Sequence, residues 1–72
     1  LMMIKREYIW IGKSNEIISC DEKLKVLNEN FDELESNFQN FFDDAMLMGC
    51  DENDFKKKVL EMVQNSKFSF EK

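Results

Sequence analysis

Apolar residues recur through the middle of this chain at alternating spacings of three and four. A period of about 3.5 residues places side chains on one face of a helix, so the pattern predicts a long helix over residues 20–48. Ser19 and Glu22 have the spacing of a capping box, and Gly49 suits the left-handed position that closes a helix. The residues on this face are Leu24, Leu27, Phe31, Leu34, Phe38, Phe41, Ala45 and Met48.

A second, shorter helix is predicted over residues 51–65. Asp51 is the expected N-cap, and Phe55, Val59 and Met62 recur on one face of the segment. Because the connection at Gly49 is so short, we expect the two helices to form an antiparallel hairpin. The predicted fold class is therefore mainly α.

The ends of the chain are less regular. Residues 1–19 read as an arm or a β-hairpin, with a Tyr-Ile-Trp-Ile run over 8–11, turn residues over 12–15 and a possible return over 16–18. An extended arm or a short helix over the same residues is an open alternative. The tail, residues 66–72, either packs Phe68 and Phe70 against the long helix or frays. All 72 residues are expected to form one small domain.

The two predicted helices differ in length, at roughly 43 and 21 Å. Folded back, the shorter helix covers the apolar face only as far as Leu34, so a second copy of the chain is expected to complete a dimeric four-helix bundle. In the alternative, the chain is a monomer covered by its N-terminal segment and tail. The candidate interaction residues are Leu24, Leu27, Phe31, Leu34, Phe38, Phe41, Phe42 and Met46.

The heptad positions favour a bundle over a parallel coiled coil. With Leu24 at position a, position e is occupied by Asn28, Glu35 and Phe42, and position g by Lys23, Asn30, Asn37 and Asp44. The flanking e and g positions lack the complementary charges that usually direct two-stranded pairing, and the phenylalanines are bulky for a two-stranded seam.

Charge is unevenly distributed along the chain. The net charge of −5 combines +1 over residues 1–19, −9 over 20–54 and +3 over 55–72, which argues against a nucleic-acid partner. Lys56, Lys57 and Lys58 form the one basic run, and we expect them to be solvated or to pair across the hairpin with Asp43 and Asp44.

No membrane association is expected either. No stretch approaches the 18–20 or so apolar residues that span a bilayer. Lys5 and Arg6 interrupt the N-terminal apolar stretch, so no secretory signal is expected. Leu1 precedes two methionines, and the native start is expected at Met2 or Met3.

The sequence offers little for catalysis or cofactor binding. Histidine is absent, and Cys20 and Cys50 at opposite ends of the long helix predict free thiols in a reducing compartment, the cytoplasm. The acidic run at Asp51 lacks the glycine and glutamate of a calcium loop, and the Gly-Lys-Ser at Gly12 lacks the first glycine of a phosphate loop. We therefore expect no enzyme, no metal and no cofactor.

Two functional hypotheses remain. The first is a non-enzymatic, self-associating module for protein–protein interaction or regulation. The second is an accessory subunit whose exposed apolar helix face binds a different protein in a larger complex. A stable dimer of the purified chain is expected under the first hypothesis. The second is distinguished by whether the chain alone is soluble and folds cooperatively, or stays molten until its partner is added.

Overall fold

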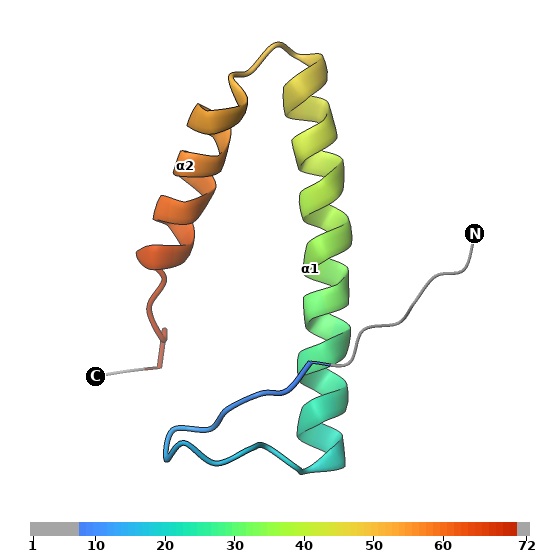
Figure 1. The fold of residues 1–72 in the computed structure, drawn as a ribbon, viewed down its shortest axis with the longest axis vertical. Coiled ribbons are helices and arrows are strands. Elements are labelled where there is room, and N and C mark those ends of the chain that lie inside the picture. The colour runs from blue at the N-terminus through green and yellow to red at the C-terminus, as the bar shows by residue number, and fades with distance from the viewer. Residues whose placement is uncertain (1–7, 71–72) are drawn as a thin grey trace, which may run out of the picture. The chain divides into compact units, whose positions relative to one another are not determined.

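The structure, a computed structural model, describes residues 8–70 and contains two helices, α1 (Asp21–Leu47) and α2 (Glu52–Gln64) (Figure 1). The predicted helical class is confirmed, and the helices begin and end within one residue of the predicted bounds. The chain divides into two compact units, residues 1–37 and 38–72, and α1 contributes to both. The predicted native start, the beginning of the predicted strand and the last two residues of the tail lie outside the described residues.

The start of α1 differs from the predicted capping box. The amide of Leu24 donates to the carbonyl of Cys20 at 2.9 Å, which makes Cys20 the N-cap residue. The predicted cap at Ser19 is therefore wrong by one residue. Asp21 and Glu22 lie in the first turn, where their carboxylates stabilise the positive end of the helix dipole without a hydroxyl cap.

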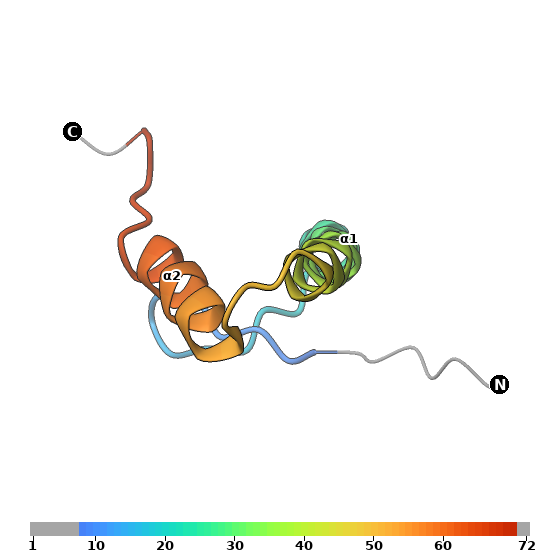
Figure 2. The same ribbon diagram turned by 90° about the horizontal axis from the view of Figure 1, so that it is seen from above.

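The end of α1 is a Schellman motif. The amide of Cys50 donates to the carbonyl of Ala45 at 3.0 Å, and the amide of Gly49 donates to the carbonyl of Met46 at 3.1 Å. Gly49 has a φ of 88°, the left-handed conformation predicted for it. The chain turns here from α1 into α2, as Figures 1 and 2 show.

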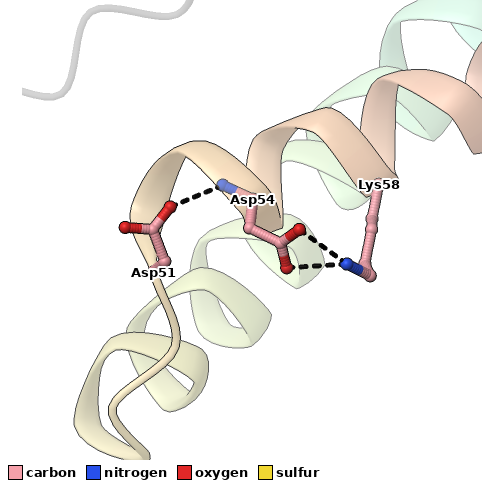
Figure 3. Close-up of polar contacts among 3 residues, drawn as sticks. All are labelled: Asp51, Asp54 and Lys58. Atoms are coloured by element: carbon pink, nitrogen blue, oxygen red, sulfur yellow. Dashed lines mark hydrogen bonds and ion pairs between the residues drawn. The ribbon is translucent and has the colours of Figure 1, made fainter.

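The start of α2 is capped by Asp51, as predicted. Its carboxylate accepts a 2.9 Å hydrogen bond from the amide of Asp54 (Figure 3). At the other end, the amide of Asn65 donates to the carbonyl of Glu61 at 2.9 Å. Local side-chain and backbone hydrogen bonds thus fix both ends of this 13-residue helix.

The described part of the N-terminal segment is a small β-turn structure with one isolated antiparallel bridge, Ile11 to Ile17. The amide of Ile18 donates to the carbonyl of Trp10 at 2.8 Å, and the amide of Gly12 donates to the carbonyl of Glu16 at 2.7 Å. No full strand forms over residues 8–20, although the segment turns where Gly12–Asn15 predicted it would.

Very few side chains are buried. Among the described residues, only Ala45 and Phe55 are buried, with 5% and 7% of their surface exposed. The ring of Phe55 lies 4.7 Å from that of Phe41, 5.6 Å from Phe42 and 5.9 Å from Phe38, measured between centroids. This aromatic cluster holds α2 against the C-terminal part of α1.

The lysine run pairs differently from the expectation. Lys56 pairs with Glu52 at 2.8 Å and Lys58 with Asp54 at 2.6 Å, both one turn apart inside α2 (Figure 3 shows the second pair). The predicted pairing of these two lysines across the hairpin is therefore wrong. The helix itself places the two residues of an i,i+4 pair side by side. Such a pair therefore costs less conformational entropy than an ion pair between two helices.

Candidate interaction surface

The packing inside the chain shields one of the two heptad rows of α1. At position a, Phe31, Phe38 and Leu24 are partly buried and Ala45 is buried. Phe38 contacts Phe55 in the aromatic cluster described above, with 5.9 Å between ring centroids.

Phe31 is shielded by the N-terminal segment. The rings of Tyr8 and Trp10 meet it edge-on, with centroids 4.7 and 5.7 Å away. Two hydrogen bonds hold these rings in place: the Tyr8 hydroxyl donates to Glu35 at 2.9 Å, and the Trp10 indole donates to Asn28 at 2.7 Å. The monomer alternative anticipated such cover for this end of the apolar face.

The other heptad row is left largely uncovered. At position d, Leu34 is 59% exposed, Phe41 58% and Met48 82%, whereas Leu27 is partly buried. Phe41 touches Phe55 with one edge and still exposes more than half of its surface. Apolar residues at this spacing on a helix are typical of a contact with another helix.

The remaining two candidate residues are Met46 and Phe42, a member of the aromatic cluster around Phe55. Phe42 and Met46 are partly buried. The Phe42 ring stacks on Phe38 at 6.2 Å, and the ammonium of Lys56 lies 5.5 Å from its centroid. These contacts give Phe42 a packing role within the chain.

Two exposed apolar features fall outside the predicted set. In α1, Val26 is more than half exposed and, with Leu27, Glu22 and Lys23, lines a shallow, largely apolar depression. In α2, Leu60 and Val63 are also more than half exposed. Val26 directly precedes Leu27 in the sequence, but it does not belong to the apolar residues with alternating spacings of three and four, so the pattern did not select it.

The N-terminal hairpin adds a third exposed apolar group. Tyr8 and Trp10 face α1, and the alternating residues Ile9 and Ile11 are exposed, together with Ile17 across the bridge. A hairpin with apolar residues on both faces resembles a strand pair that is covered on both sides.

The tail remains exposed. The rings of Phe68 and Phe70 contact each other at 5.7 Å, and both are more than half exposed. Packing of these rings over a helix is therefore absent from the described structure. They add to the apolar surface of the C-terminal unit.

Among the charged groups of the described residues, Lys58 has a shifted pKa. The hydrogen bond from Lys58 to Asp54 raises the pKa of the lysine, with smaller effects of burial and neighbouring charges. Cys20 and Cys50 are exposed free thiols. The described residues contain no cluster of three or more His, Cys, Asp or Glu side chains placed to hold a metal ion.

Neither α1 nor α2 combines the length with the apolar content that crossing a bilayer would require.

Comparison with known proteins gives no relative for this chain. No protein-family model matches the sequence, no curated protein is detectably similar to it, and no solved structure matches its fold. Proposals about function therefore rest on the surface described above.

Proposed function

We propose that this protein is a non-enzymatic module for protein–protein interaction that acts as a homodimer. The supporting observation is the division of the apolar register of α1. The a row is shielded by Phe55 and by the aromatic N-terminal segment, whereas Leu34, Phe41 and Met48 of the d row are left to solvent.

The energetics favour covering this row. Burying apolar surface contributes about 25 cal/mol per Å², and a chain this small has little core to offset its conformational entropy. With only Ala45 and Phe55 buried among the described residues, association supplies the burial that folding of one chain leaves out. Two-fold pairing of identical surfaces is the commonest form such association takes.

Light scattering after size exclusion, over a range of protein concentrations, tests the proposal. We expect the native chain to have twice the monomer mass at micromolar concentration. Leu34→Asp places a charge in the exposed row without removing an aromatic contact, and we expect it to give a folded monomer.

Ser36→Asp is the matched control. Ser36 is exposed two residues away, on the opposite side of α1, and receives the same charge. We expect this variant to remain a dimer. A native chain that stays monomeric and stably folded at 100 micromolar or so would rule out self-association.

A second candidate function is that of an accessory subunit that binds a different protein. The exposed isoleucines of the hairpin, Ile9, Ile11 and Ile17, favour it because extended apolar segments commonly pair with a strand of another chain. Under this alternative, the purified chain is monomeric, and Ile9→Asp abolishes binding of the partner while Leu34→Asp does not.

The two exposed free thiols, Cys20 and Cys50, support a reducing compartment such as the cytoplasm as the site of action.

A further inference from the structure

We propose that two copies of the chain join the edges of their N-terminal hairpins, with residues 8–11 of one copy antiparallel to residues 8–11 of the other. This inference rests on the proposed self-association and names a contact within it. We call the outer side of residues 8–11 the hairpin edge. Figure 1 shows the hairpin in blue, before the start of α1.

The backbone groups of Ile11 point away from the hairpin. Ile11 and Ile17 face each other across the bridge, between the two backbone hydrogen bonds that join the arms of the hairpin. A pair in this position is non-hydrogen-bonded, so the N–H and C=O of Ile11 are directed to the outer side. Neither group forms a hydrogen bond with another described residue.

Ile9 repeats this arrangement two residues earlier. Tyr8 and Trp10 are partly buried against α1, whereas Ile9 and Ile11 are more than half exposed. This alternation is that of an extended strand, in which residues two apart direct their backbone groups to the same side. No hydrogen bond joins the backbone of Ile9 to another described residue either. The hairpin edge therefore presents alternating donors and acceptors in a row.

The hairpin edge lacks the features that keep sheet edges apart. It contains no proline and no charged residue, and its exposed side chains are two β-branched isoleucines. Charged residues, proline or a covering element usually protect an edge strand, and an unprotected apolar edge is a template for pairing. The other arm of the hairpin offers a shorter edge, because Asn15 lies in the turn with a φ of 64° and α1 begins at Asp21.

The hairpin edge is its own complement, which identifies a second copy as the occupant. Ile9 and Ile11 flank Trp10 symmetrically, so a two-fold axis at Trp10 sets Ile9 of each copy opposite Ile11 of the other. Both are hydrogen-bonded pairs, in which the two residues exchange their N–H···O=C bonds. Every outward backbone group of the two isoleucines gains a partner, and their side chains meet as cross-strand pairs on the exposed face.

The size of this contact makes it one part of the interface. A stable protein–protein interface buries about 800 Å² per partner, which is more than the short hairpin edge provides. The exposed Leu34 of α1 belongs to the same compact unit as the hairpin, residues 1–37. The hairpin edge therefore adds a contact of defined register to the apolar contact proposed for α1.

Disulfide cross-linking tests the register. Ile9→Cys and Ile11→Cys are made separately in chains whose exposed native thiols, Cys20 and Cys50, are replaced with serine. The Cα atoms of a hydrogen-bonded antiparallel pair lie about 5.5 Å apart, within the range of a disulfide. With oxidised glutathione as the oxidant, we expect the equimolar mixture to give at least about fivefold more cross-linked dimer than either variant alone, because neither position faces itself in the second copy.

Ile17→Cys is the matched control for position 11. Ile17 is an exposed isoleucine directly opposite Ile11, but it lies on the other arm of the hairpin. In the proposed pairing it is two strands, or about 10 Å, from position 9 of the second copy. Its mixture with Ile9→Cys should cross-link no more than the single variants. Trp10 emission verifies that every variant keeps the hairpin packed on α1.

Methylation of the Ile11 amide nitrogen, by chemical synthesis, tests the hydrogen bonds. This amide donates to no described residue, so its methylation removes an outward donor and leaves the bonds within the hairpin in place. We expect the dimer dissociation constant, measured by sedimentation equilibrium, to rise about tenfold. The Lys13 amide also donates to no described residue but lies in the turn, and its methylation should change the constant by less than about twofold.

The outcomes separate this inference from the proposed function. A native chain that is monomeric in the light-scattering test overturns both, and leaves the hairpin edge to a strand of a different protein. A native dimer in which the mixture cross-links no more than the controls, or in which methylation at Ile11 has no effect, overturns the edge pairing while self-association holds. Stronger cross-linking of either variant alone than of the mixture indicates a parallel contact and also overturns the antiparallel pairing.

Discussion

The indole of Trp10 donates a 2.7 Å hydrogen bond to the side-chain oxygen of Asn28, eighteen residues further along the chain. This bond ties the N-terminal segment to α1 at the point where Trp10 also packs on Phe31. The contact is part-buried, so loss of the acceptor leaves an indole donor that water reaches poorly.

We predict that Asn28→Ala destabilises the N-terminal unit by about 1 kcal/mol, because the indole donor loses its partner. Trp10 emission should shift to longer wavelength as the ring becomes more hydrated. Urea titration followed by tryptophan fluorescence measures both effects. Asn30→Ala, at an exposed position nearby, should change neither the emission nor the midpoint.

Phe55 is the side chain on which the packing of α2 depends. We predict that Phe55→Ala costs about 3–5 kcal/mol, because a buried ring that contacts Phe38, Phe41 and Phe42 is lost. Circular dichroism at 222 nm should fall as α2 unwinds. Met62→Ala, at an exposed position of the same helix, is the control. A native signal in Phe55→Ala would show that the aromatic cluster is dispensable.

The left-handed backbone of Gly49 predicts opposite changes in stability for L-alanine and D-alanine at this position. An added Cβ meets no atom within 4 Å, so the cost of Gly49→Ala comes from the left-handed backbone alone, about 1 kcal/mol. D-alanine, which prefers positive φ, should instead stabilise the chain by a few tenths to 1 kcal/mol. Chemical synthesis of both chains followed by thermal unfolding compares them. The same direction of change for the two would contradict the backbone explanation.

The Asp54–Lys58 pair predicts a pH dependence. The hydrogen bond to Asp54 raises the pKa of Lys58, so the pair stabilises the folded state below the ordinary lysine pKa of about 10.4. That contribution disappears as the pH rises through the raised pKa. We predict that Asp54→Asn lowers the pKa of Lys58, measured by NMR titration of its side chain. Glu52→Gln, which removes the partner of Lys56, should leave the Lys58 titration almost unchanged.

The helices and most of their ends could be predicted because the signals are local. The spacing of apolar residues gave the lengths of α1 and α2, and both Gly49 and Asp51 act through hydrogen bonds within a few residues. The i,i+4 ion pairs of α2 were also readable from spacing. The expectation that Lys56 and Lys58 would pair across the hairpin overlooked acidic residues one turn away.

The packing of the N-terminal segment on Phe31 was predicted only as one of two alternatives, the other being a second copy of the chain. Tyr8 and Trp10 reach it through contacts that span more than twenty residues of sequence, and periodicity carries no information about such pairs. The exposure of Leu34 depends on the same contact, because the side on which the N-terminal segment packs decides which heptad row stays open. The dimer remains a prediction.

The placement of the aromatic residues has a spectroscopic consequence. The single tryptophan and the single tyrosine both belong to residues 1–37, whereas residues 38–72 contain phenylalanines alone among the aromatic types. Light absorbed near 295 nm therefore reports on the N-terminal unit, and far-ultraviolet light reports on the backbone of both. A melt recorded at the two wavelengths would reveal, without a label or a substitution, whether one unit loses its structure before the other.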